Sequence, residues 1–110
     1  MNLQSILKEL DLQVISKGEP LDRNCAGCYV SDLLSDVMGH AKEGEIWMTI
    51  QTHSNVVAVA LLLNLAAILF TSGVKPEPDT VEKAEEEGGL LLSTKMSTFE
   101  TAGRLYQLLT

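Results

Sequence analysis

The chain has 110 residues, which corresponds to a single domain, and we expect one α/β domain over residues 1–110. Its 15 Asp and Glu outnumber its 8 Lys and Arg, and the formal charge of −7 argues against nucleic acid as a partner. Hydrophobic residues make up 45% of the sequence and charged residues 21%, which excludes a disordered chain and predicts a packed core.

The chain is predicted to open with a helix and a short strand. Apolar residues recur at helical spacing over residues 3–10, and Asn2 is a good N-cap for them. This helix should end near Asp11, and the alternation of apolar and polar residues over 12–16 predicts a strand. A glycine and a proline within residues 17–24 predict a loop.

A second strand and a second helix are predicted next. Residues 28–30 favour a strand, and the residues after it carry one apolar stripe at helical spacing. We expect Ser31 to cap this helix and Gly39 to stop it. The residues of the stripe are Val30, Leu33, Leu34, Val37 and Met38.

Two buried strands and an apolar helix are predicted in the middle of the chain. Residues 46–50 and 66–70 are nearly continuous apolar runs, typical of strands that are covered on both faces. Residues 56–63 between them are apolar around the whole circumference of a helix, so that helix must be covered on more than one side. A partner subunit is one way to cover it.

The last third predicts a helix, a strand and a final helix. An acidic start with Pro78 and an end at Gly88 and Gly89 delimit the first of these helices. Residues 89–92 predict the last strand, and Ser97 with Glu100 forms a capping box for the final helix. The predicted inner face of the final helix consists of Phe99, Ala102, Leu105, Tyr106 and Leu109.

This order of elements predicts a fold class. Strands that alternate with helices through short connections pair in parallel with right-handed crossovers. We therefore expect a three-layer α/β domain, with a mostly parallel sheet of four to five strands flanked by helices and a short N-terminal helix.

Neither a secretory signal nor a membrane span is predicted. The first ten residues lack an apolar core, and the apolar run over 56–70 is shorter than the roughly 20 residues that cross a bilayer. Two cysteines are too few to staple a domain of this size, which fits a reducing compartment. We expect a cytoplasmic protein with no membrane partner.

Polar residues follow three of the predicted strands, where an open α/β sheet binds its ligands. Each loop also leads into a helix, so free backbone N–H groups there would favour an anion such as phosphate. Alternatively, the hydroxyl groups only cap helices and turns. The candidate ligand-binding residues are Thr52, His53, Asn55, Thr71, Ser72 and Gly73, with Gln51, Ser54, Ser93, Thr94 and Lys95 beside them.

The two histidines differ in their placement. His53 lies in the candidate site, where it either donates to a ligand and changes charge near neutral pH, or is an ordinary surface histidine. His40 follows Gly39 at a predicted helix end, where it is expected to contact the C-terminal end of the helix dipole at most.

Cys25 and Cys28 form a C-x-x-C pair with three possible roles. They are structural thiols, a redox pair, or half of a metal or cluster site that a dimer would complete. The sequence contains no second C-x-x-C and no H-x3-5-H pair, which weakens the metal interpretation.

Common catalytic motifs are missing. The sequence contains no G-x4-G-K-[ST], G-x-G-x-x-G, G-x-S-x-G or H-E-x-x-H. We therefore expect no enzyme activity and no cofactor.

Residues 46–109 resemble the DRTGG domain. The resemblance rests on residues 68–78 (ILFTSGVKPEP), on 89–94 (GLLLST), and on 97–102 (STFETA). Residues 47–60 are similar to standalone members of the family that are labelled HPr-kinase-like. Thr71 and Gly73 match the Thr-Gly-Gly of the family, whereas Thr52 and His53 stand where the family has Asp-Arg.

The resemblance implies a homodimerising module that is regulatory or senses a ligand, without the kinase domain. Our first hypothesis is therefore a non-enzymatic homodimer that binds a small anionic or nucleotide-like metabolite. The second is a pure interaction module, in which the helix over 56–63 forms a dimer or docks onto a metabolic enzyme. The third is a redox or metal sensor that acts through Cys25 and Cys28.

Overall fold

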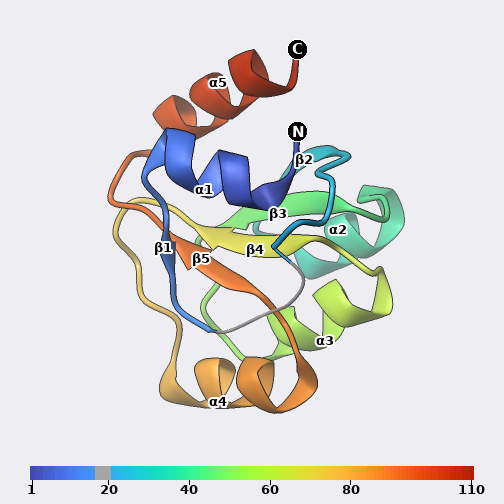
Figure 1. Ribbon diagram of the computed structural model, residues 1–110. Helices are drawn as coiled ribbons and strands as arrows, with labels where there is room; N and C mark the ends of the chain where they lie inside the picture. The colour runs from blue at the N-terminus through green and yellow to red at the C-terminus, as the bar shows by residue number, and fades with distance from the viewer. Residues whose placement is uncertain (17–20) are drawn as a thin grey trace.

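A five-stranded sheet runs through the computed structural model, which describes residues 1–16 and 21–110. The strand order is β1-β5-β4-β3-β2, and only β1 is antiparallel to its neighbour (Figure 1). In chain order the elements are α1 (Leu3–Leu10), β1 (Gln13–Val14), β2 (Gly27–Val30), α2 (Leu34–His40), β3 (Glu45–Thr49), α3 (Asn55–Leu62), β4 (Ala67–Phe70), α4 (Pro78–Glu87), β5 (Leu91–Ser93) and α5 (Thr98–Leu109). The predicted fold class is confirmed.

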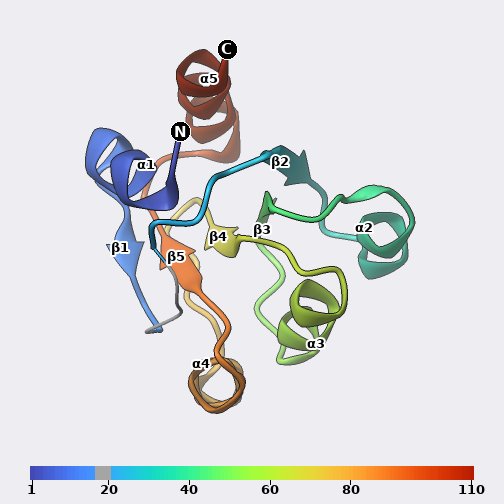
Figure 2. The ribbon, with the colours of Figure 1, turned by 45° about the vertical axis from the view of Figure 1, so that its right-hand side comes forward.

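The helices cover both faces of this sheet. Figure 2 shows α1 and α5 on one side and α2, α3 and α4 on the other. Two hydrophobic cores result: Ile46, Met48 and Leu69 pack under α1 and α5, whereas Trp47 and Ile68 pack under the other three helices. Since both faces are covered, β3 and β4 are buried along nearly their whole length, as their apolar sequences indicated.

The predicted caps of three helices are confirmed. The Asn2 side chain accepts a hydrogen bond from the amide of Ser5, and α1 ends at Asp11 in the left-handed conformation. The Ser97 hydroxyl accepts from the amide of Glu100 at the start of α5. Helix α4 begins at Pro78 and ends at Gly88, whose φ of 81° is a conformation that glycine adopts without strain.

The predicted limits of α2 were wrong. Ser31 does not cap the helix, because its hydroxyl accepts from the amide of Leu33 in the turn before α2. Gly39 does not stop it either, since the helix continues to His40. Of the predicted apolar stripe, Val37 is fully buried, while Met38 is about half exposed.

The predicted inner face of α5 was also partly wrong. Leu105 is buried, but Phe99 is 90% exposed and Tyr106 is 70% exposed. Thr101 and Leu105 define the side of the helix that packs on the sheet, and residues 99 and 106 point to its opposite side.

The strands agree with the predictions within one or two residues. Strand β1 is shorter than predicted, but Ser16 extends its pairing with β5, because its hydroxyl donates to the carbonyl of Gly89 and accepts from the amide of Leu91. The last strand lies at Leu91–Ser93 rather than at 89–92. Part of the predicted loop over 17–24 lies outside the described residues.

The apolar helix α3 is covered mainly by its own chain. It packs on β4 and lies between α2 and α4 (Figure 2). These contacts bury Val56, Val57, Val59 and Ala60 without a partner subunit, whereas Leu62 remains 70% exposed. Within residues 1–16 and 21–110, no helix has the length and apolar character needed to cross a membrane.

Candidate functional site

The parallel strands end at one edge of the sheet, which we call the carboxyl edge. Thr49 of β3 pairs with Phe70 of β4, and Phe70 pairs with Ser93 of β5, so the loops that follow these strands start side by side. The amide of Glu77 donates to the carbonyl of Thr52, which ties the loop after β4 to the loop after β3. The expected convergence of these loops is therefore observed.

The loop after β3 is held by its own hydrogen bonds. The carbonyl of Thr52 also accepts from the Thr80 hydroxyl at 2.7 Å. The Nδ1 atom of His53 accepts from the amide of Asn55 at 3.1 Å, so the imidazole caps the first turn of α3. These contacts give Thr52 and His53 a structural role in the loop and leave the His53 side chain exposed.

The loop after β4 is tied to the loop after β5. Thr71 is fully buried, and its hydroxyl lies 2.6 Å from the hydroxyl of Thr98. The amide of Ser72 donates to the carbonyl of Met96, and the amide of Gly73 donates to that of Thr94. Both Ser72 and Gly73 adopt positive φ angles, which direct their backbone toward the loop after β5.

Several of the amides expected to be free in these two loops are hydrogen-bonded within the chain. The N–H groups of Asn55, Val56, Ser72, Gly73 and Val74 all donate to acceptors within the chain. These five amides are therefore not available to an anion at this edge.

An open groove with a volume of about 1040 Å³ lies beyond the ends of β4 and β5. We call it the β4–β5 groove. Its walls come from residues within 10–15, from 72–76 after β4, from 93–96 after β5, and from the first two turns of α5. Ser72 and Gly73 of the predicted site line it, and so do Ser93, Thr94 and Lys95.

Four of the predicted residues do not line the groove. Thr52, His53 and Asn55 lie after β3, and Thr71 is buried beneath the groove wall. Lys75 and Arg104, which were not among the predicted residues, also line it. Lys75 lies two residues after Gly73, so its position after the β4 strand also predicts a place at this edge. In contrast, only the packing of α5 brings Arg104 there.

The path of the chain explains the position of the groove. Helix α4, which follows β4, runs along one face of the sheet, and α5, which follows β5, runs along the other (Figure 2). Adjacent loops that leave for opposite faces open a crevice at the carboxyl ends of their strands. The helices that follow β3 and β4 lie on the same face, so their loops do not diverge in this way.

The groove concentrates positive charge in an acidic chain. Lys75, Lys95 and Arg104 line it, and they are three of the eight Lys and Arg in the sequence. Two carboxylates also line it, Asp11 and Glu100, and Glu100 forms an ion pair of 2.8 Å with Arg104. The groove is thus suited to an anionic group.

A second cavity, of about 110 Å³, lies elsewhere, between α3 and the turn after α4. Its cation, Arg23, already donates to the carbonyls of Asn64 and Leu65 and to the side chain of Asn64. The small volume and the engaged guanidinium make it a structural feature rather than a ligand site.

The other end of the carboxyl edge carries acidic groups. The carboxylate of Asp32, which follows β2, accepts from the Thr49 hydroxyl at 2.8 Å and from the amide of Ile50 at 2.9 Å. The Gln51 side chain donates to the carbonyl of Asp32. This carboxylate therefore already occupies the space beyond the end of β3.

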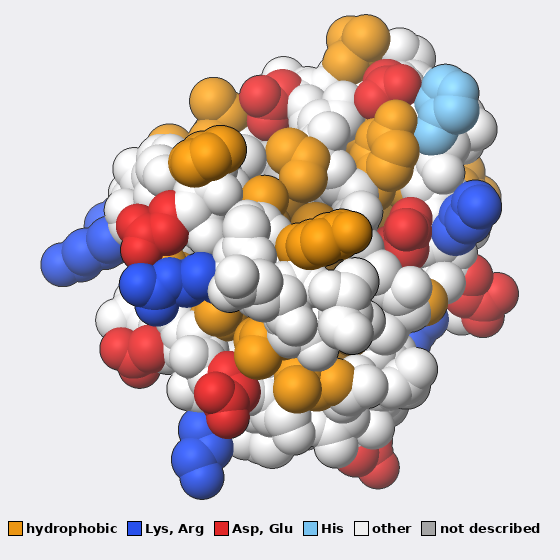
Figure 3. Space-filling view, turned by 90° about the horizontal axis from the view of Figure 1, so that it is seen from above, with side chains coloured by type: hydrophobic (Ala, Val, Ile, Leu, Met, Phe, Trp, Pro, Cys, Tyr) orange, Lys and Arg blue, Asp and Glu red, His pale blue; other side chains and the backbone are white. Residues whose placement is uncertain are grey.

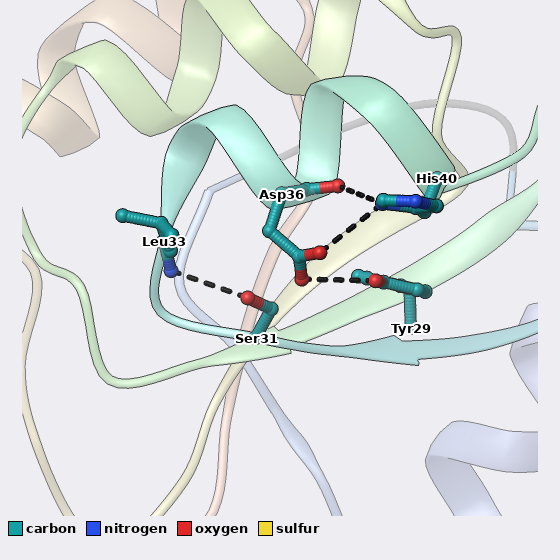
Figure 4. A network of polar contacts seen from close by, with 5 residues as sticks. All are labelled: Tyr29, Ser31, Leu33, Asp36 and His40. Carbon is teal, nitrogen blue, oxygen red and sulfur yellow. Dashed lines mark hydrogen bonds and ion pairs between the residues drawn. The ribbon is translucent and has the colours of Figure 1, made fainter.

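A polar network connects β2 with α2 (Figure 4). The Tyr29 hydroxyl donates to Asp36 at 2.9 Å, and the His40 ring stacks on Tyr29 and lies 3.1 Å from the Asp36 carboxylate. Hydrogen bonding from Ser31 and Tyr29, together with the nearby His40, lowers the pKa of Asp36. The His40 ring also lies 3.1 Å from the Asp36 carbonyl oxygen in the last turn of α2, as its position at a helix end led us to expect.

The two cysteines are free thiols in a poor environment for reactivity. Cys25 is buried in the core, and its thiol donates to the carbonyl of Gly27. Burial raises the pKa of Cys28 to about 12, with smaller contributions from Cys25 and Glu45. Both thiols are protonated at neutral pH, which favours the structural role. Among the described residues, no group of three or more His, Cys, Asp and Glu side chains could hold a metal ion.

Comparisons with known proteins agree with the fold. The DRTGG domain family matches residues 5–108. The chain is also similar, with a TM-score of 0.69 and 20% identity, to the CBS and DRTGG domains of the regulatory region of Clostridium perfringens pyrophosphatase, solved in complex with the activator diadenosine tetraphosphate. That similarity covers 94% of this chain and 45% of the other, so the chain spans less than half the length of that relative. The comparison with curated proteins finds no match.

Proposed function

Because the chain belongs to the DRTGG domain family, we propose that it is a regulatory module that senses a ligand and catalyses no reaction. The proposed ligand is a small anionic or nucleotide-like metabolite that binds at the carboxyl edge of the sheet. The observation that carries this proposal is the β4–β5 groove, where Lys75, Lys95 and Arg104 gather in a chain with a charge of −7.

The pyrophosphatase structure supports the proposal. It contains a DRTGG domain within the regulatory region of an enzyme, and that structure is complexed with a nucleotide activator. A metabolic enzyme is accordingly the kind of target that we propose for regulation by this chain. We place the protein in the cytoplasm, where Cys25 and Cys28 stay reduced.

The predicted site residues have three different roles in this proposal. Ser72 and Gly73 contact the ligand from the wall of the groove. Thr52, His53 and Asn55 shape the rim after β3. Thr71 positions the loop after β4 through its hydroxyl contact with Thr98.

A thermal-shift screen of adenine nucleotides and acyl phosphates tests the proposed binding. A ligand that binds only the folded state adds about 2.7 kcal/mol of stability at 100 times its Kd, which raises the Tm of a domain this size by roughly 10 °C. The same compounds added to a Ser72→Trp variant, which fills the exposed wall of the groove, should shift Tm less. No shift of the wild-type Tm with any compound of the panel contradicts the proposal.

We also propose that the protein forms a homodimer. Support comes from β2, which is an edge strand of the sheet and has no strand partner on its outer side among the described residues. Helix α5 packs beside β2 and exposes Phe99 and Tyr106. Figure 3, which views the molecule from above, shows several hydrophobic side chains lying open across this face. Exposed apolar surface of this kind marks interaction sites.

Analytical ultracentrifugation at micromolar concentration tests the dimer. We expect a dimer for the wild type and a monomer for the double variant Phe99→Lys/Tyr106→Lys, because two charges would be buried without partners. Leu62→Lys on the exposed side of α3 is the matched control and should remain dimeric. A dimer that only Leu62→Lys disrupts would move the interface to α3, and a monomeric wild type would remove the homodimer from the proposal.

A further inference from the structure

We infer that the ligand of the β4–β5 groove carries a chain of two or more phosphates, bound by Lys75, Lys95 and Arg104, and that Glu100 competes with this ligand for Arg104. The inference rests on the proposed function, because it names the chemical class that the same carboxyl edge recognises. It also assigns binding roles to three cations outside the predicted site.

The three cations of the groove come from separate elements. Lys75 comes from the loop after β4, Lys95 from the loop after β5, and Arg104 from the second turn of α5. Like charges repel across an open groove, and this repulsion is relieved when an anion lies between them. In the described part of the chain, the only ion pair that involves these three residues is that between Arg104 and Glu100.

The volume of the groove favours a ligand with more than one phosphate. A groove of about 1040 Å³ is at the upper end of the range of roughly 300 to 1,000 Å³ that is usual for small-molecule sites. A single phosphate is far smaller than this space, whereas a chain of phosphates reaches cations that three separate elements supply. Ammonium groups bind phosphate oxygens as point charges, and a guanidinium binds them through two parallel hydrogen bonds.

Three backbone amides beside the groove are already hydrogen-bonded within the chain. The amides of Ser72, Gly73 and Val74 donate within the chain, so the loop after β4 offers them to no ligand. Apolar side chains also line the groove, among them Ile15 and Val81, and these provide a surface for a nucleoside attached to the phosphates.

Glu100 opposes the binding of any anion in this groove. Its carboxylate lies 2.8 Å from the guanidinium of Arg104, one turn along the same helix. Both side chains are about half exposed, and exposed pairs at this spacing are weak, so a phosphate replaces the carboxylate at little cost. Glu100 thus lowers the affinity for every anion and favours ligands with several charges.

Isothermal titration calorimetry of the full chain tests the inference with three probes: inorganic phosphate, tripolyphosphate and ATP. We expect tripolyphosphate and ATP to bind at least about tenfold more tightly than phosphate, a difference of about 1.4 kcal/mol. Equal affinity for tripolyphosphate and ATP identifies the phosphate chain as the ligand, and tighter binding of ATP identifies a nucleotide.

Charge variants assign the binding to the groove. Lys75→Gln, Lys95→Gln and Arg104→Gln should each weaken tripolyphosphate binding about fivefold to tenfold. Lys42→Gln, which removes the same charge from the exposed segment before β3, is the matched control and should change the affinity less than twofold. Glu100→Gln should strengthen binding about threefold, whereas Glu86→Gln on the exposed side of α4 should not.

The outcomes separate this inference from the proposed function. If the three groove variants bind tripolyphosphate as Lys42→Gln does, the groove is not the phosphate site and the inference is wrong. If the wild type binds a compound of the thermal-shift panel but no probe with several phosphates, the inference is also wrong, while the ligand-sensing function stands. If the wild type binds no compound at all, both fail.

Discussion

Parallel strands form both ends of the carboxyl edge, but the two ends carry opposite charges. At the β2–β3 end, the Asp32 carboxylate accepts from the Thr49 hydroxyl and from the amide of Ile50, so an anion of the chain itself occupies the strand end. At the β4–β5 end, Lys75 and Lys95 line an open groove, and the ion pair there between Arg104 and Glu100 is a weak surface pair.

This contrast indicates that a strand end is open to a ligand only where no group of the chain itself fills it. Hydrogen bonds join the loop after β4 both to the loop after β3 and to the loop after β5. The helices that follow β3 and β4 lie on the same face, however, whereas those that follow β4 and β5 lie on opposite faces. A general rule about parallel sheets thus selects the edge, and the path of α5 selects the position along it.

The largest effect is expected when the internal anion is removed. Asp32→Ala deletes the acceptor of the Thr49 hydroxyl and of the Ile50 amide. Because Thr49 is buried, its hydroxyl loses a partner that water cannot readily replace, and we expect the free energy of unfolding to fall by about 2 kcal/mol. Urea unfolding followed by circular dichroism measures this change.

Two control variants accompany the stability measurement on Asp32→Ala. Asp32→Asn keeps a carbonyl oxygen at the same place and should recover part of the loss, and Glu86→Ala on α4 should change the stability by less than about 0.5 kcal/mol. Tripolyphosphate binding by Asp32→Ala should match that of the wild type. A loss of binding without a loss of stability would mean that the two ends are not independent.

A smaller effect is expected from the pH dependence of the acidic end. Ser31 and Tyr29 hydrogen bonds and the neighbouring His40 hold the pKa of Asp36 below its ordinary value of 3.8. A carboxyl group with a lowered folded-state pKa contributes stability that is present above its unfolded pKa and is lost as the pH falls through the folded value. The stability difference between wild type and Asp36→Asn should therefore shrink between pH 6 and pH 3.

Urea unfolding of both proteins at several pH values checks this expectation. Asp22→Asn, an exposed aspartate for which the structure records no ion pair among the described residues, is the matched control, and its difference from wild type should vary less with pH. A difference for Asp36→Asn that stays constant from pH 6 to pH 3 contradicts the role of the Tyr29–Asp36–His40 network.

Much of the fold was predictable because local signals and burial agree. Asn2, Pro78, Gly88 and Ser97 act at helix ends as their chemistry predicts, and the apolar runs of β3 and β4 are buried on both faces. The failures occurred where the local signal was weak. Gly39 is tolerated within the short helix α2, which is anchored mainly by Val37 and by its contacts with the sheet.

The candidate site was predictable only in part. Ser72, Gly73, Thr94 and Lys95 reach the groove because they directly follow β4 and β5. The exposure of Phe99 and the arrival of Arg104 in the groove both depend on how α5 is rotated against the sheet, and apolar residues on two sides of that helix left the rotation open.

By itself, the sequence determined the order of the elements, the caps of α1, α4 and α5, and the edge at which polar loops meet, because these depend on spacing and on neighbours along the chain. Only the tertiary structure decided that α5 crosses to the face opposite α4, and with it the position of the groove and its charge. The physical reason is that Lys75, Lys95 and Arg104 are brought together by packing between distant segments, and no local pattern records which segments will meet.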